Sequence, residues 1–304
     1  MKYDPKKVTK LAEYLVATNN LPVSLMEKDV WLTYILNELY SIEESKQLAF
    51  KGGTCLVKAY YGYYRFSEDI DLTWTGIKVK EHEFRNKVIK QIMTELGLEW
   101  YHDEKVKTGI AGTQSGNVMS YFLLAPTQGS QPIKLKITVA FKEKLEFKPK
   151  QIQLKTPIPV NLQKETVALY AQAAEDYFKN PAVLCYALEE IACEKIRAIL
   201  TRKEQLNRSR DIVDLYKISK DLKGLKNAAP PKQAKAKLVQ SLKIPSYATE
   251  YARNTQNLGK HLEKLVIQAS IDPVFIEKPD QKELSKFAKE LEKYITKEII
   301  PTLI

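Results

Sequence analysis

Residues 50–72 of the chain read FKGGTCLVKAYYGYYRFSEDIDL. The stretch begins at the end of a short apolar run, residues 48–50, which predicts a strand. Two glycines follow, and residues 54–61 have the pattern of a short helix. Glycines at a strand-to-helix junction let backbone N–H groups approach a phosphate, and the start of a helix adds the positive end of its dipole. The junction therefore predicts a phosphate-binding turn at Gly52 and Gly53.

The same stretch ends in two acids, Asp69 and Asp71, in a run that alternates polar and apolar residues as a half-buried strand does. Residues two apart on a strand point to the same face. Mg²⁺ prefers paired carboxylates of this kind and bridges them to substrate phosphates. Alternating acids also occur on the solvated face of ordinary strands, but the preceding glycine turn makes the pattern specific. We expect Asp69 and Asp71 to bind Mg²⁺ or Mn²⁺, while Gly52, Gly53 and Thr54 hold the β- and γ-phosphates of a nucleoside triphosphate (NTP).

Elsewhere the pattern separates into two parts. Helices are predicted at residues 5–19, 24–40 and 80–96, and strands at 121–125, 133–141 and 151–156. From about residue 165 onwards every strong signal is helical. The order predicts an α+β fold, with a mixed β-sheet domain and N-terminal helices over residues 1–160 and a helical domain over residues 161–304.

Composition excludes several classes of protein. Of the 304 residues, 44% are hydrophobic and 28% charged, as in globular proteins with a buried core. No apolar run approaches the roughly 20 residues that span a bilayer, and the basic start lacks the apolar core of a signal peptide. The three cysteines are too widely spaced for a disulfide framework or a zinc ribbon. We therefore expect a cytoplasmic protein with no membrane partner.

The positive charge is concentrated in one segment. The chain has 48 Lys and Arg against 37 Asp and Glu, a net charge of +11. Residues 195–243 contain fourteen Lys and Arg and four Asp and Glu, a net of +10. Such a segment favours a polyanionic partner such as nucleic acid or nucleotide phosphates. A lysine-rich, solvated helical face is the alternative.

Four motifs follow one another along the chain: EKDVW at residues 27–31, the stretch at 50–72, LEEIA at 188–192 followed by Lys195 and Arg197-Ala198, and RSRDIVDLY at 208–216. They resemble, in the same order, the EKDYW, KGGTxL…RxSxDxDL, LEEIxAxKxxAL and RDxxDLY elements of the AbiEii family. This family is a branch of the nucleotidyltransferase superfamily and includes the AbiEii/MenT toxins of type IV toxin–antitoxin systems. The resemblance covers roughly residues 20–220.

The resemblance implies a nucleotidyltransferase-like fold and a metal-dependent enzyme of the EC 2.7.7 type. Such an enzyme transfers a nucleoside monophosphate (NMP) from an NTP to a hydroxyl group. The resemblance further implies that the acceptor is tRNA, modified at its 3′ end so that translation stops. It also implies a toxin whose partner is a separately encoded, AbiEi-like antitoxin. The basic segment independently favours RNA as the acceptor.

Two charged residues fall on apolar helical stripes. At about 100° per residue, Lys195 lies among the apolar residues of its helix, with Arg202 on the same side, and Asp211 lies on the stripe of the next helix. A buried salt bridge would explain this placement. The family pattern implies instead that Lys195 and Asp211 are catalytic, with Lys195 contacting nucleotide phosphates and Asp211 positioning it or completing the site. We count Arg202 among the nucleotide-binding residues.

Two further residues of the central stretch are candidates. Arg65 is a possible clamp on a phosphate. Ser67 lies two residues before Asp69, where it could donate a hydrogen bond to phosphate or be a target of modification. A purely structural role in the turn is open for both, and we include both among the expected nucleotide-binding residues.

The chain departs from the family at one position. Where a KxE-type strand is common, residues 133–138 read IKLKIT, so Lys136 stands where a third acid is expected. In many nucleotidyltransferases that acid is the base for the attacking hydroxyl. Either Asp211 is the base in place of this acid, or the reaction depends only on the metal and on the positioning of the substrates. Two alternatives therefore stay open: a nucleotide- or RNA-binding regulator without turnover, and a nucleotidyltransferase acting on a protein or a small molecule.

Overall fold

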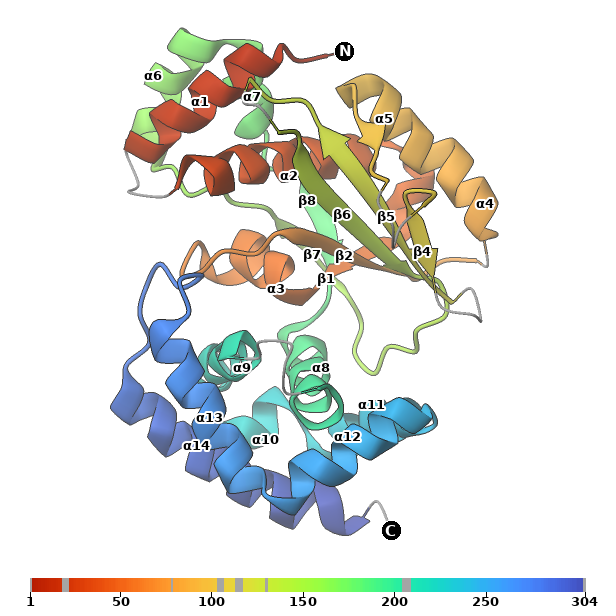
Figure 1. The fold of residues 1–304 in the computed structure, drawn as a ribbon, viewed down its shortest axis with the longest axis vertical. Helices are drawn as coiled ribbons and strands as arrows, with labels where there is room; N and C mark the ends of the chain where they lie inside the picture. Colours follow the sequence, from red (N-terminus) through yellow and green to blue (C-terminus); the bar gives the residue numbers. More distant parts are fainter. Residues whose placement is uncertain are drawn as a thin grey trace. The chain divides into compact units, whose positions relative to one another are not determined.

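The computed structural model describes residues 2–17, 22–77, 79–102, 107–112, 117–128, 131–203 and 209–302 (Figure 1). The chain divides into two compact units. Unit 1 consists of Met1–Lys144 and Pro149–Cys185, and unit 2 of Leu145–Lys148 and Tyr186–Ile304. The domain division between residues 160 and 161 stays a prediction, while contacts group residues 161–185 with unit 1.

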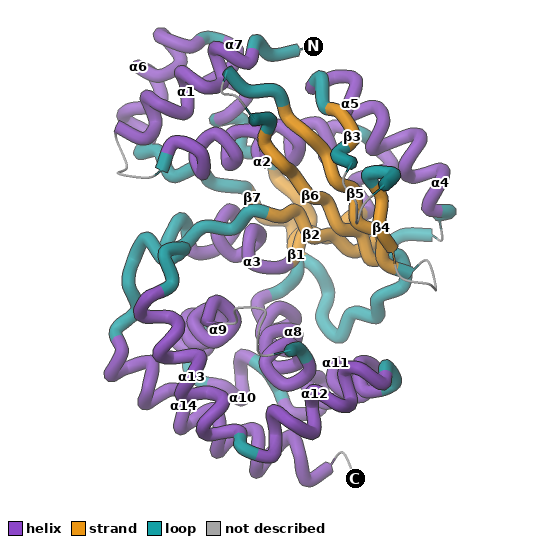
Figure 2. The backbone as a smooth tube through the Cα atoms, viewed as in Figure 1, coloured by secondary structure: helices purple, strands orange, loops and turns teal. Residues whose placement is uncertain are grey.

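Unit 1 is built on one mixed sheet in the strand order β3-β5-β6-β2-β1-β8-β7, with β4 paired to β5. Strands β2 and β6 are parallel, as are β1 and β8, and the other pairs are antiparallel. The strands are β1 (Leu48–Lys51), β2 (Asp69–Trp74), β3 (Glu99–Trp100), β4 (Ile110–Gly112), β5 (Val118–Ala125), β6 (Ile133–Ala140), β7 (Lys150–Gln153) and β8 (Ala182–Cys185). Figure 2 shows the strands of the sheet in orange.

The helices of unit 1 lie around this sheet (Figure 1). They are α1 (Pro5–Ala17), α2 (Val23–Ser41), α3 (Gly52–Cys55), α4 (Glu81–Phe84), α5 (Lys90–Leu96), α6 (Val160–Tyr170) and α7 (Gln172–Tyr177). A 3₁₀ segment at Glu43–Gln47 precedes β1, and π-helical segments continue α3 (Leu56–Tyr61) and α4 (Arg85–Ile89). The expected first helix thus ends at Ala17, and residues 18–21 lie outside the described residues.

Alternation along the strands gives the sheet an apolar and a polar face. Ile70 and Leu72 of β2 and Ile137 of β6 are completely buried. Helix α2 packs against β6 and covers the core with its own buried side chains. The intervening residues, Asp69 and Asp71, are only half-buried and point to the opposite face. The core thereby fixes the register that presents both aspartates together.

The described part of unit 2 is helical (Figure 2). Its helices are α8 (Leu188–Thr201), α9 (Ser209–Asp221), α10 (Leu225–Ala228), α11 (Pro231–Leu242), α12 (Pro245–Gln256), α13 (Leu258–Ile271) and α14 (Gln281–Tyr294). A π-helical segment, Ile295–Ile299, and a 3₁₀ turn, Ile300–Thr302, follow. Helix α8 is the centre of the unit, because α9, α10, α11 and α12 all pack against it. Within the described ranges, no helix is long and apolar enough to cross a membrane.

The mixed sheet and the helical C-terminal half confirm the α+β class. One expectation is wrong: the chain is not entirely helical after residue 165, because β8 inserts between β1 and β7. Four residues, AVLC, are too few to show a periodicity of their own. The predicted strand at residues 151–156 is shorter than expected and begins one residue earlier, as β7.

Candidate active site

The turn between β1 and α3 needs both of its glycines. Gly52 has a φ of +77°, and a Cβ on it would lie 2.8 Å from Oδ2 of Asp71. A Cβ on Gly53 would lie 2.2 Å from Nη2 of Arg65. The backbone of the turn therefore passes directly against a carboxylate of β2 and a buried guanidinium. The glycine turn thus lies beside Asp71, and its binding of phosphate stays a prediction.

Thr54 joins the turn to the start of β2. Its hydroxyl donates to the backbone carbonyl of Asp69 and lies 2.8 Å from Oγ of Ser67. Thr54 is also buried. Because its hydroxyl is engaged inside the protein, a phosphate contact from Thr54 in this conformation would come from its backbone N–H. The nucleotide-binding roles of Thr54 and Ser67 stay predictions.

Arg65 is buried rather than open to solvent. Its Nη1 donates to the carbonyl of Phe66 at 2.8 Å, and its guanidinium carbon lies 5.6 Å from the centre of the Tyr64 ring. Together with its contact at Gly53, this holds the far side of the turn. Arg65 thus packs against the turn from the interior of the protein, and its role as a phosphate clamp stays a prediction.

Asp69 and Asp71 each have a basic residue beside them in the sheet. Asp69 pairs in register with Lys136 of β6, and Asp71 pairs with Lys51 of β1 on one side and with Thr138 of β6 on the other. Nζ of Lys136 lies 3.7 Å from Oδ2 of Asp69. Burial raises the pKa of Asp69, Lys136 opposes this, and the neighbouring Asp71 raises it further. The two carboxylates therefore repel each other, as expected of groups that share a cation.

The residues present fit one divalent cation. The two aspartates supply carboxylate oxygens from one strand face next to the glycine turn. No group of three or more His, Cys, Asp and Glu side chains that could hold a metal occurs among the residues that the structure describes. The register places Lys136 directly beside Asp69, at the position where the sequence analysis expected a third acid. Phosphate and water oxygens would have to complete the coordination.

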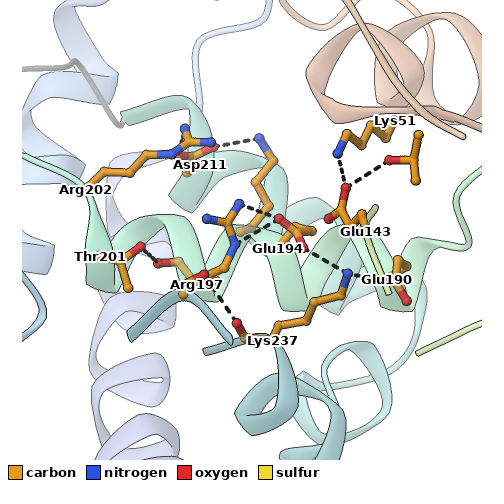
Figure 3. Close-up of polar contacts among 12 residues, drawn as sticks. Lys51, Glu143, Glu190, Glu194, Arg197, Thr201, Arg202, Asp211 and Lys237 are labelled. Atoms are coloured by element: carbon orange, nitrogen blue, oxygen red, sulfur yellow. Dashed lines mark hydrogen bonds and ion pairs between the residues drawn. The ribbon is translucent and has the colours of Figure 1, made fainter. Parts of the chain in front are cut away.

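Glu143 is an acid near this face that the sequence analysis missed. It follows β6, and its Oε2 accepts hydrogen bonds from the Thr73 hydroxyl at 2.9 Å and from the ammonium of Lys51 (Figure 3). Thr73 shares a face of β2 with the two aspartates. Glu143 balances the charge of Lys51, which neighbours Asp71 in the sheet. No sequence pattern identifies it, because it reaches the sheet from a loop.

Lys195, in unit 2, is held by two acids. Its Nζ lies 2.6 Å from Oδ1 of Asp211 and 2.6 Å from Oδ2 of Asp214. The Lys195 and Asp211 side chains are each 11% exposed and the Asp214 side chain 0%. Burial raises the pKa of Asp211, but the charges of Lys195 and Arg202 outweigh it, and the pKa lies below its usual range. The structure thus contains a buried ion pair, and a catalytic role for Lys195 and Asp211 stays a prediction.

Asp214 was missed, although the sequence contains a signal for it. It lies three residues after Asp211, so both project from neighbouring positions of α9. Arg202 lies at the edge of the group, with Nη1 3.9 Å from Oδ2 of Asp211 and a side chain that is partly exposed. Its nucleotide-binding role stays a prediction. Arg208, the first residue of the fourth motif, lies outside the described residues.

Glu190 of the third motif has a structural role. Glu190 accepts hydrogen bonds from the backbone N–H groups of Glu146 and Phe147 at 2.9 and 2.8 Å. Its other oxygen lies 2.5 Å from Nζ of Lys237, which also lies 3.1 Å from Glu194 (Figure 3). These contacts hold residues 145–148 and α11 against α8, so Lys237 is structural and is not part of an exposed basic surface.

Ion pairs within unit 2 neutralise at least eight of the fourteen Lys and Arg of the basic segment 195–243. They hold Lys195, Arg197, Arg202, Arg210, Lys217, Lys220, Lys226 and Lys237. Most of their acidic partners come from outside the segment: Glu190, Glu194, Asp272, Glu277, Glu283 and Glu298. The charge of the segment alone therefore overstates its positive surface.

Helix α14 and the segment after it present a different row of cations. Lys282, Lys286, Lys289, Lys293 and Lys297 are exposed. Their spacing of three or four residues places them on one side of the helix, opposite the buried Leu284, Phe287 and Leu291. No ion pair holds any of the five within the part of the chain that the structure describes. We call these five residues the α14 lysine row.

The chain is similar to a known protein family and to solved structures. The profile of the family described as "Nucleotidyl transferase AbiEii toxin, Type IV TA system" matches residues 34–297. JHP933 from Helicobacter pylori has a similar structure, with a TM-score of 0.51, 15% identity, and coverage of 91% of this chain and 95% of that one. MenT4, a nucleotidyltransferase toxin from Mycobacterium tuberculosis, gives a TM-score of 0.52 at 13% identity, with coverage of 96% of this chain and 91% of that one. No curated protein matches the sequence.

At these identities the two structures establish the fold alone, whereas the family profile spans both the aspartate pair on β2 and the Lys195 group. It supports an enzyme that uses an NTP and has an antitoxin partner. The chain belongs to the AbiEii family of nucleotidyltransferase toxins of type IV toxin–antitoxin systems.

Proposed function

We propose that this toxin is a Mg²⁺-dependent nucleotidyltransferase that transfers an NMP from an NTP to an RNA hydroxyl, at the 3′ acceptor end of tRNA, and so blocks translation in the cytoplasm. One observation carries the proposal. Asp69 and Asp71 leave β2 on one face, and Asp71 lies so close to the turn that a Cβ on Gly52 would be 2.8 Å from its carboxylate. A metal ligand and a phosphate-binding backbone are therefore adjacent.

Each part of the chain has a definite task in this reaction. Asp69 and Asp71 would hold the metal, which when bound withdraws charge from the α-phosphate and the pyrophosphate leaving group. The backbone N–H groups at Gly52 and Gly53 orient the β- and γ-phosphates. Lys195 neutralises phosphate charge in the transition state, and its two acids, Asp211 and Asp214, fix the position of its ammonium group.

Charge supports RNA as the acceptor. The net charge is +11, and the α14 lysine row offers five exposed ammonium groups along one side of a helix. Such a row can follow the phosphates of a nucleic acid backbone. The same charge repels small cationic substrates, which argues against that alternative acceptor class. A protein acceptor is an outcome that the following experiment would reveal.

The test is transfer of label from each of four [α-³²P]NTPs to total tRNA with Mg²⁺. Wild-type protein should label RNA with at least one NTP, and Asp69→Ala should lower the rate by at least about 10²-fold. Glu68→Gln is the matched control, because Glu68 is the neighbouring carboxylate and pairs with Lys28 instead. It should keep most of the activity. Label that persists in Asp69→Ala would contradict the assignment, and label in protein would replace RNA as the acceptor.

A further inference from the structure

Lys136 of β6 stands where the resemblance led us to expect a third acid. Lys136 is the in-register neighbour of Asp69 across the parallel pair β2 and β6. Its ammonium lies 3.7 Å from Oδ2 of Asp69, and its side chain is 35% exposed. The contact is longer than a hydrogen bond. The Asp69 carboxylate can therefore contact Lys136 and a bound cation at the same time.

An ammonium in this position cannot act as a carboxylate would. It has three N–H donors and no lone pair, so it cannot coordinate a metal. It also repels a divalent cation brought close to Asp69. The described residues contain no group of three acids, histidines or cysteines that could replace the missing ligand. Glu143 does not stand in for it, since its carboxylate is engaged by Lys51 and Thr73.

The charges nevertheless balance with a single metal ion. Asp69, Asp71 and Lys136 together carry a net charge of −1, so one divalent cation makes the site +1. With an acid in place of Lys136 the net charge would be −3, and two divalent cations would be needed to reach the same +1. A nucleoside triphosphate would then meet the same net charge in either arrangement.

We propose that Lys136 takes the place of a second divalent ion, so that this enzyme binds its nucleotide with one metal ion rather than two. The inference rests on the proposed function. In it, Asp69 and Asp71 hold the one ion, and the Lys136 ammonium supplies the remaining positive charge to the substrate. Lys136 donates hydrogen bonds to substrate phosphate, where a second ion would otherwise bridge protein and substrate oxygens.

The test counts Mn²⁺ ions on the full-length protein. Electron paramagnetic resonance and calorimetry would measure Mn²⁺ binding in the presence of each of four NTP analogues with a non-hydrolysable α,β-linkage. Wild-type protein should bind one tight ion with the accepted nucleotide. Lys136→Glu should bind two. Lys136→Met removes the charge without adding a ligand, so it should still bind one, about tenfold more tightly because the repulsion is gone.

The outcomes separate the inference from the function on which it rests. Two tight ions on wild-type protein, or a single ion on folded Lys136→Glu, would overturn the inference and leave the nucleotidyltransferase proposal standing. Binding of neither nucleotide nor Mn²⁺ would overturn both. The number of Mn²⁺ ions bound to wild-type protein tests the inference without any variant. Circular dichroism checks the fold of the two variants.

Discussion

The chain contains two groups of the same composition, each with two aspartates and one lysine. We call Asp69, Asp71 and Lys136 the open trio, and Lys195, Asp211 and Asp214 the buried trio. In the open trio the ammonium lies 3.7 Å from one carboxylate and the Asp69 side chain is 48% exposed. In the buried trio the ammonium lies 2.6 Å from both carboxylates, and Asp214 is wholly buried.

The two trios differ in how completely the lysine neutralises the two carboxylates. The buried trio has excellent geometry, because the lysine satisfies both acids directly and little solvent reaches them. In the open trio the two carboxylates lie on a half-exposed strand face and the lysine is 3.7 Å from one of them, so we expect the trio to gain from a metal ion and phosphates. The same three side chains therefore form a half-exposed group, where we propose the ligand site, and a buried ion pair in the other place.

The largest expected effect comes from removing the lysine of the buried trio. Lys195→Met removes the ammonium that lies 2.6 Å from both buried carboxylates, Asp211 and Asp214, which should destabilise unit 2 by about 3–5 kcal/mol. Thermal and urea unfolding would measure this. Lys195→Met combined with Asp211→Asn and Asp214→Asn should recover part of the loss, because the two buried side chains are then neutral. If Lys195→Met unfolds like wild type, the buried trio is not a stabilising unit.

The equivalent change in the open trio should behave differently. Lys136→Met frees Asp69 on a partly exposed face, so its unfolding midpoint should stay close to that of wild type. A loss of stability as large as that of Lys195→Met would remove the distinction between the two trios. The two variants are matched, since each replaces the lysine of one trio by the same residue.

A smaller effect is expected at the α14 lysine row. Replacing Lys282, Lys286 and Lys289 by alanine should weaken tRNA binding about tenfold at low salt. It should also lower the slope of log affinity against log salt by about two, since each phosphate contact contributes roughly 0.7 to 0.9. Alanine at Lys217, Lys220 and Lys226 is the matched control, because these lysines already have acidic partners. Equal losses in both triple variants would contradict a specific role for the row.

The smallest expected effect is on the free energy of unfolding, to which Asp211 and Asp69 contribute with opposite pH dependence. The pKa of Asp211 is lowered in the folded protein, so its contribution to stability is present above the unfolded value of 3.8 and is lost as pH falls below it. The pKa of Asp69 is raised, so its contribution is present below that value and is lost as pH rises through the folded pKa. In metal-free buffer at pH 7, Asp211→Asn should therefore destabilise the protein and Asp69→Asn should stabilise it slightly. Unfolding curves with the same sign for both variants would break the comparison.

The open trio was predictable because its signals are local. The glycine turn, the spacing of Asp69 and Asp71, and the alternation along β2 all lie within one stretch, and the departure at Lys136 is visible in the sequence. The contact between Lys136 and Asp69 depends on strand register and required the structure. Glu143 had no signal, since a loop brings it to the sheet.

The net charge of residues 195–243, counted from the sequence, does not show which lysines pair with acids elsewhere in the chain. Its lysines meet acids that lie up to about 72 residues later in the chain, such as Glu298 opposite Lys226. The strand β8 was missed for a related reason, because its four residues become a strand only between β1 and β7. Asp214, by contrast, could have been found from its spacing to Asp211 on α9.

The most direct test of the account is equilibrium binding of Mn²⁺ and nucleotide to two folded variants, Asp69→Asn and Asp211→Asn. Asp69→Asn should lose tight Mn²⁺ binding, while Asp211→Asn should retain it, because we assign the metal to the open trio. Retention by Asp69→Asn together with loss by Asp211→Asn would contradict the assignment of the metal to the face of β2.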